Sequence, residues 1–147
     1  MRVIKTFMVI VLSVVGLYRG SSAAETISYI PESDVEIFVF QKLDLSTFRS
    51  SLGPRRTVSM RTFPAFGMSP NVLKKGIIQF ETDDWFYEIE IKGRKDYNGD
   101  GIEDLAICFT DRAKKGTYSA RKSLLVTRYS KDGLLVALNY EIDACGK

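Results

Sequence analysis

The chain has 147 residues, 45% hydrophobic and 27% charged, and it contains no His. The lack of His excludes Ser-His-Asp and Cys-His catalysis in their usual forms and most zinc sites. Three of the 21 basic residues lie within residues 1–24, which leaves 18 basic residues against 18 acidic ones in the rest of the chain. A generic nucleic-acid binder would need a net basic face, and a near-neutral chain argues against one.

Residues 1–24 have the pattern of a secretory signal peptide. Basic residues open the segment, the apolar run 7–17 follows, and small residues at 21–24 offer a cleavage site. The run is too short to span a bilayer comfortably, so a retained membrane anchor is the weaker alternative. We therefore expect a periplasmic or secreted protein with no stable membrane span after cleavage. Residues 25–147 then suit a single domain with one core.

The first half of this domain shows two short element signals. Residues 35–40 (VEIFVF) are β-branched and aromatic, which predicts a short strand. Residues 46–52 are compatible with one or two helical turns, capped by Asp44 or Ser46 and ended at Gly53.

Residues 54–70 should be irregular, because three prolines and a glycine interrupt them. Phe63 and Phe66 are expected to plug the open face of a sheet. Arginines dominate interface hot spots, so a partner-binding role is the competing interpretation for the basic residues of this segment. The candidate partner-binding residues are Arg55, Arg56 and Arg61.

The second half of the chain reads as β-structure throughout. In residues 85–92 every second residue is apolar, which is typical of a half-buried strand, and Asp132-Gly133 indicates a hairpin turn. Other strand-like runs are residues 77–80, 105–109, 124–129 and 134–142. We expect a mainly β fold (α+β being the variant), with an antiparallel meander of about five strands and a small helical element.

The strongest motif is the nine-residue run 96–104, DYNGDGIED. Oxygen-bearing side chains occupy its positions 1, 3, 5 and 9, and a glycine at position 6 permits a sharp turn. Ca²⁺ takes six to eight oxygen ligands, which alternate residues of a curled loop can supply. The spacing predicts a calcium site. A solvated acidic turn that binds nothing is the alternative.

The loop departs from an EF-hand, because position 12 is Ile107 where an EF-hand needs a bidentate Glu. It resembles instead the D-x-[DN]-x-D-G-x-x-D calcium loops of FG-GAP and VCBS repeats, which join two antiparallel strands. The resemblance covers about a dozen residues in one copy, so it implies ligand roles but no propeller. The implied ligands are the side chains of Asp96, Asn98, Asp100 and Asp104 and the carbonyl of Ile102. A bound ion would then be structural.

Two further features bear on function. Cys108 and Cys145 are an even pair in an exported chain, so a disulfide is favoured over two free thiols. Glu88 and Glu90 share one strand face at a spacing that suits a glycosidase pair, although alternate glutamates on an exposed strand are ordinary. Residues 112–122 carry a basic run that most simply reads as a solvated loop.

The leading hypothesis is a small, exported, calcium-binding protein without enzymatic activity. It would bind another protein in the cell envelope or outside the cell, as inhibitors and immunity proteins do. The alternatives are a carboxylate-based hydrolase of envelope polysaccharide and a structural subunit of an envelope assembly.

Overall fold

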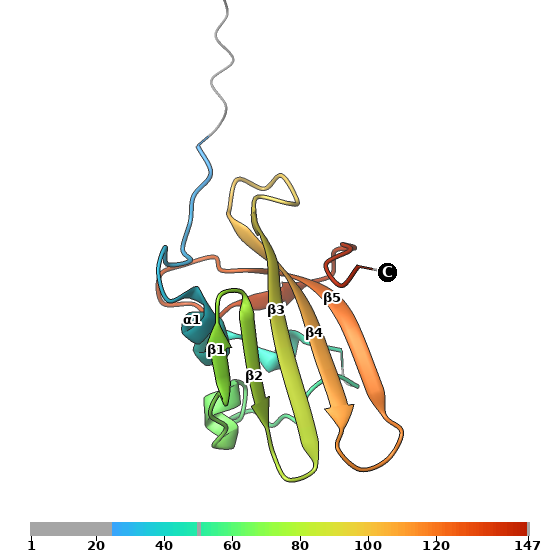
Figure 1. Cartoon of the computed structure of the whole chain (residues 1–147). Helices are drawn as coiled ribbons and strands as arrows, with labels where there is room; N and C mark the ends of the chain where they lie inside the picture. The colour runs from blue at the N-terminus through green and yellow to red at the C-terminus, as the bar shows by residue number, and fades with distance from the viewer. Residues whose placement is uncertain (1–24, 50, 147) are drawn as a thin grey trace, which may run out of the picture.

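The computed structural model describes residues 25–49 and 51–146, so the predicted signal peptide lies outside the described residues. One antiparallel sheet has the strand order β1-β2-β3-β4-β5-β6 and dominates the fold (Figure 1). Its strands are β1 (Val72–Lys74), β2 (Ile77–Glu81), β3 (Trp85–Lys95), β4 (Asp104–Ala113), β5 (Ser119–Thr127) and β6 (Val136–Leu138). The predicted antiparallel meander is confirmed, with six strands where about five were expected.

Three short helices pack against one face of this sheet. They are α1 (Val35–Lys42), the 3₁₀ turn η1 (Leu45–Thr47) and the 3₁₀ turn η2 (Phe63–Phe66). Helical turns were expected over residues 46–52, and η1 overlaps this range only at residues 46–47. Asp44 caps η1, as predicted, by accepting a 3.0 Å hydrogen bond from the Ser46 N–H. The predicted small helical element is therefore present in more than one piece.

The expectation of a strand at residues 35–40 was wrong, because these residues form α1. Glu36 in its first turn and Lys42 in its last turn match the helix dipole. Val39 and Phe40 are buried against the sheet, so the segment gains more from burying one helical side than from its residues' preference for strands. Tertiary packing decides the conformation here.

The core lies between the helices and the inner face of the sheet, with Phe63 at its centre. The Phe63 side chain is 0% exposed, and its ring centroid lies 4.4 Å from that of Phe80 and 5.7 Å from that of Phe40. Phe66 is partly buried against the same cluster. The prediction that these two phenylalanines fill the open face of the sheet is confirmed.

The last two strands differ in length from their prediction. β5 already begins at Ser119, whereas β6 covers only residues 136–138 of the expected 134–142. β6 pairs with residues Leu125 to Thr127 of β5 and then leaves the sheet. The chain beyond Leu138 crosses to the other face, where Cys145 bonds to Cys108.

Candidate metal centre

The acidic loop joins β3 to β4 at one end of the sheet, where Figure 1 shows it projecting from the tops of these strands. Gly99 and Gly101 have φ values of 78° and 84°, a region that L side chains avoid, so these two positions let the loop curl. Just before the loop, Gly93 leaves room for the Tyr97 ring, because a Cβ at Gly93 would lie 1.9 Å from the Tyr97 hydroxyl oxygen.

The predicted ligand side chains at the start of the loop turn inward onto its backbone. Asp96 accepts hydrogen bonds from the N–H groups of Gly99 (2.7 Å) and Gly101 (2.9 Å). Asp100 accepts one from the Ile102 N–H at 2.8 Å, and Asn98 accepts one from the Asp100 N–H at 3.0 Å. These contacts gather the oxygen atoms within one small turn.

Asp104, the last predicted ligand, is 0% exposed. Its Oδ2 accepts from the Tyr97 N–H at 3.0 Å, whereas its Oδ1 is buried without a hydrogen-bond partner among the described residues. Burial raises the pKa of Asp104, and the nearby charges of Asp100 and Asp96 raise it further, while hydrogen bonding from the Tyr97 N–H and from the Thr127 side chain opposes both effects. A buried carboxylate oxygen without a partner is costly, so it points to a missing positive group.

The Ile102 carbonyl points toward the inside of the acidic loop. Ile27 bridges to Ile102 in parallel fashion: its N–H donates to the Gly101 carbonyl and its carbonyl accepts from the Glu103 N–H, both at 2.8 Å. Backbone groups of successive extended residues point to opposite sides, so the groups of Ile102 point away from Ile27. The bond from the Ile102 N–H to Asp100 agrees with that direction.

Ionic contacts also hold the segment around Ile27 against the loop, a feature that the sequence did not predict. The Ser28 hydroxyl donates to Glu103 at 2.5 Å, and the Arg94 guanidinium lies 2.8 Å from the same carboxylate. Arg94 also donates to the carbonyls of Ile30 (3.0 Å) and Pro31 (2.8 Å). Its hydrogen bond to Glu103 is the main reason that the pKa of Glu103 is lowered.

Within residues 25–49 and 51–146, no three Asp, Glu, Cys or His side chains are grouped as a ready metal cluster. The hydrogen bonds above explain this, because the loop carboxylates bind their own N–H groups instead of converging on one point. Tyr129 lies close to them: burial raises its pKa, and the charges of Asp100 and Asp104 raise it further.

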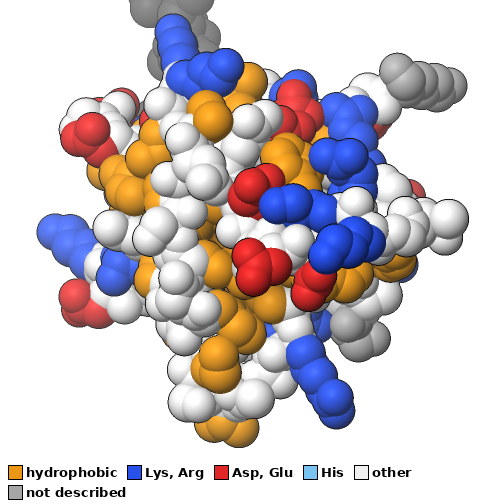
Figure 2. Space-filling view, turned by 60° about the horizontal axis from the view of Figure 1, so that its bottom comes forward, with side chains coloured by type: hydrophobic (Ala, Val, Ile, Leu, Met, Phe, Trp, Pro, Cys, Tyr) orange, Lys and Arg blue, Asp and Glu red, His pale blue; other side chains and the backbone are white. Residues whose placement is uncertain are grey.

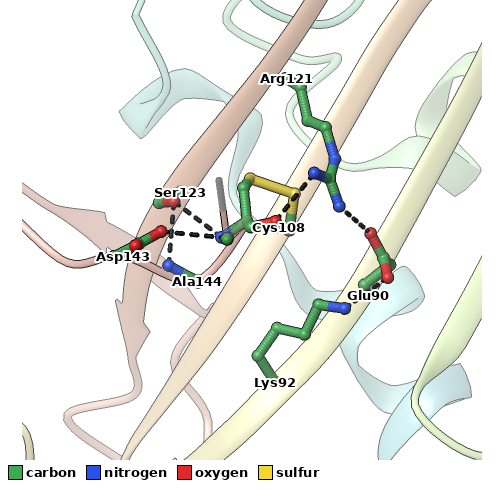
Figure 3. Close-up of a disulfide and its surroundings, with 9 residues drawn as sticks. Glu90, Lys92, Cys108, Arg121, Ser123, Asp143 and Ala144 are labelled. Carbon is green, nitrogen blue, oxygen red and sulfur yellow. Dashed lines mark hydrogen bonds and ion pairs between the residues drawn. A yellow bond between two sulfur atoms is a disulfide. The ribbon is translucent and has the colours of Figure 1, made fainter.

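The two cysteines form the expected disulfide on the outer face of the sheet (Figure 3). Their Cα atoms are 4.8 Å apart, within the usual range for such a bond. The Ser123 hydroxyl accepts from the N–H groups of Ala144 and Cys145, both at 3.0 Å, and Arg121 donates to the Cys145 carbonyl at 2.8 Å. The C-terminal segment is thus fixed to β4 and β5.

Of the three candidate partner-binding arginines, two bind groups of the chain itself. Arg61 forms a salt bridge with the buried Asp44, and Arg56 donates to backbone carbonyls, including that of Arg49 at 3.1 Å. Arg55 is exposed. The structure therefore gives Arg56 and Arg61 a role in holding the irregular segment.

The Glu88 and Glu90 side chains both lie on the outer face of β3. Glu88 accepts a hydrogen bond from Gln79. A hydrogen bond from Lys92 and a weaker effect of the one from Arg121 lower the pKa of Glu90 (Figure 3). A catalytic acid needs the opposite shift, so the arrangement does not favour a glycosidase pair.

The basic run at residues 112–122 is largely paired with neighbouring groups. Arg112 lies over the Phe86 ring, with its guanidinium carbon 4.9 Å from the ring centroid, and Lys114 lies 3.1 Å from Glu81. Figure 2 shows Lys and Arg side chains lying next to Asp and Glu side chains on the face that it presents. Most of the positive charges of this run are therefore balanced by nearby acidic or aromatic groups.

The chain matches no protein-family model, no curated protein and no solved structure.

Proposed function

We propose that this chain is an exported calcium-binding protein that acts by binding another protein, without catalytic activity. The observation that carries the calcium assignment is the buried, unpartnered Oδ1 of Asp104 beside the charges of Asp96 and Asp100. A divalent cation would supply the positive group that this arrangement lacks.

The donor set suits Ca²⁺ because it consists of oxygen atoms only. A carboxylate oxygen has more than one lone pair, so Asp96 and Asp100 can keep their N–H contacts and still bind a cation. Asn98, the Ile102 carbonyl and Asp104 would complete the protein ligands, with water in the remaining positions.

The ion would have a structural role. It would connect the ends of β3 and β4 and stiffen the loop to which Ile27 and Ser28 are hydrogen-bonded. A Lewis-acid role would require an open coordination position beside a substrate cleft, and no observation in the loop favours one.

Export is supported by the signal-like pattern of residues 1–24 and by the disulfide, because disulfides persist in oxidising compartments. In the part of the chain that the structure describes, no helix is long and apolar enough to cross a membrane. The signal-like pattern and the disulfide together favour a location in the periplasm or outside the cell. Protein binding is favoured over hydrolysis because the glutamate pair on β3 is hydrogen-bonded and ion-paired.

Thermal unfolding with and without Ca²⁺ tests the calcium assignment. At a Ca²⁺ concentration of about 100 times Kd, linkage adds about 2.7 kcal/mol, which corresponds to a rise in Tm of about 10 °C. Asp100→Ala should abolish the rise. Asp132→Ala, which removes an exposed carboxylate from the β5–β6 turn, is the matched control and should keep it.

Terbium luminescence provides an independent readout, because Tyr129 lies near Asp100 and its ring can transfer energy to a bound lanthanide. We expect emission that added Ca²⁺ suppresses in the wild type and that is lost in Asp100→Ala. A melting curve that neither Ca²⁺ nor EDTA moves, together with no loop-dependent emission, would show that the loop is only an acidic turn.

A further inference from the structure

Residues 119–124 of β5 form an open sheet edge. β6 pairs only with Leu125, Val126 and Thr127, so residues 119–124 have no strand partner on the side away from β4 within the described chain. An open edge presents unpaired N–H and C=O groups that another strand can bind.

The direction of these backbone groups follows from the pairing of β6. The Ala137 N–H donates to the Thr47 hydroxyl at 2.9 Å, so Ala137 points away from β5, and its neighbours Val136 and Leu138 point toward β5. Their partners on β5 are Thr127 and Leu125. By the same alternation, the residues whose backbone groups point to the open edge are Ser119, Arg121 and Ser123.

A cleft of about 750 Å³ lies beside this edge, between β5, the segment after η1 and the C-terminal segment. Phe48, Leu52 and Leu124 give it apolar lining. Arg49 and Lys122 add exposed basic groups, and Glu141 and Asp143 add exposed acidic ones from the C-terminal segment. The disulfide and the bonds to Ser123 hold its outer wall in place (Figure 3). The cleft is therefore a fixed slot and not a gap left by a loose tail.

We infer that this edge accepts an extended segment of a partner protein as an added antiparallel strand. The strand would carry an apolar residue opposite Leu124 and an acidic residue two positions later, opposite Lys122. The backbone groups of Lys122 and Leu124 point toward β4, so on the open edge these residues form non-hydrogen-bonded pairs, in which side chains approach most closely. This inference deepens the protein-binding part of the proposed function and does not depend on calcium.

A second copy of the chain fits this edge poorly. Antiparallel pairing of two β5 edges would bring Arg121 and Lys122 of one copy close to the same residues of the other. Like charges opposite one another destabilise such a pair, whereas an acidic strand complements them. Among the described residues Arg121 is already ion-paired with Glu90, so Lys122 is the edge residue that favours an acidic residue on a different partner.

The test uses the ¹⁵N-labelled mature protein and the acetylated, amidated peptide Val-Thr-Asp-Thr-Thr-Thr, whose six residues would lie opposite residues 124 to 119 and leave the pairing of β6 intact. We expect chemical-shift changes and slower amide exchange at Arg121 and Ser123, with Kd in the range of about 1 mM that a short peptide gives. The peptide with Lys in place of Asp should bind at least about fivefold more weakly. Titrations with and without Ca²⁺ should agree, so a failed calcium assignment and a failed edge assignment are distinguishable.

Two variants separate strand addition from other contacts. Arg121→Pro removes the edge N–H, which proline tolerates at an edge, and should weaken binding about tenfold or more. Arg121→Ala is its matched control, since it loses the same side-chain contacts to Glu90 and Cys145 but keeps the N–H. Lys122→Glu should reverse the preference between the Asp and Lys peptides.

Equal binding by Arg121→Pro and Arg121→Ala would overturn strand addition, and an unchanged peptide preference in Lys122→Glu would overturn the acidic partner. Shifts confined to β1 or to the outer face, or no binding by either peptide, would also overturn the inference. A concentration-dependent dimer that Arg121→Pro dissolves would assign the edge to a second copy instead.

Discussion

Removal of the Cys108–Cys145 disulfide should cost this protein a large part of its stability. The bond joins residues separated by 37 positions in sequence. In the chain-entropy model, closing a loop of this length removes about 13 cal/mol/K from the unfolded chain, or about 4 kcal/mol at 25 °C. The perturbation is the double variant Cys108→Ala with Cys145→Ala.

The native state should change little in this variant. Cys108 is fully buried on the outer face, so truncation leaves a small void worth about 1 kcal/mol. The hydrogen bonds of Ser123 to the C-terminal segment remain available, so the segment need not detach. The expected total loss is about 4–5 kcal/mol, a large fraction of the stability of a domain of this size.

Urea unfolding measures this loss directly. The midpoint should fall strongly, and the m value should rise, because an unfolded chain without the crosslink exposes more surface. Reduced wild type should behave like the double variant, which controls for the two substitutions. A loss below about 1 kcal/mol with an unchanged m value would refute the entropic reasoning and would mean that the unfolded chain remains compact without the bond.

Two further predictions concern buried carboxylates. Burial raises the pKa of Asp111, whose Oδ2 accepts from the Gly53 N–H at 2.7 Å, so wild-type stability falls as pH rises from about 3.8 through the folded pKa. Asp111→Asn should remove that part of the pH dependence and gain about 1 kcal/mol at pH 7 in urea unfolding; an unchanged pH profile would contradict this. Burial by itself raises the pKa of Asp44, but hydrogen bonds from Arg61 and Ser46 lower it overall. The ionised Asp44 carboxylate therefore stabilises the fold above the pKa that it has in the unfolded chain. This stabilisation is lost as pH falls through the pKa that Asp44 has in the folded protein. Arg61 is 48% exposed and Asp44 only 1%, so Arg61→Ala should lower the urea unfolding midpoint more at pH 7 than at pH 3, with partial rescue in Arg61→Lys; an equal loss at both pH values would contradict the salt bridge as the cause.

The strand β3 could be predicted because apolar and polar residues alternate along its sequence. In β3, Tyr87 and Ile89 face the core while Glu88 and Glu90 face outward, and a period of two is visible in one dimension. β1 was missed because it has only three residues and is followed by a lysine and a glycine, so no alternation develops. β6 is equally short, but it lies within the strand-like run 134–142 and was therefore predicted.

The helix α1 could not be predicted from local pattern. Its β-branched and aromatic residues favour a strand, and the contacts that favour a helix come from Phe63 and Phe80, well separated from it in sequence. Glu36 adds another distant contact by accepting from the Gly76 N–H at 2.7 Å. No signal within residues 35–42 encodes these partners.

The loop was accessible from sequence because its oxygen donors fall within nine consecutive residues. Its contacts with Ile27, and those of Arg94 with residues 28–32, were not, since they join segments more than 60 residues apart. The open edge of β5 was hidden for a related reason: it depends on where β6 leaves the sheet, and residues 134–142 read as one continuous strand.

Three connections that hold this fold together converge on β4. Asp104 ties its first residue to the loop, Cys108 ties its middle to the C-terminal segment, and Asp111 ties its far end to Gly53. Asp104 and Cys108 lie four residues apart along an extended strand, about 13 Å, so the free energies from calcium and from the disulfide should add. One exposed hydrogen bond, from the Tyr140 hydroxyl to the Tyr97 carbonyl at 3.1 Å, links the C-terminal segment to the loop. Calcium should therefore raise the unfolding free energy of the Cys108→Ala, Cys145→Ala variant by as much as it raises that of the wild type, within about 0.5 kcal/mol. A calcium effect that disappears with the disulfide would mean instead that the two ends of β4 fold as one unit.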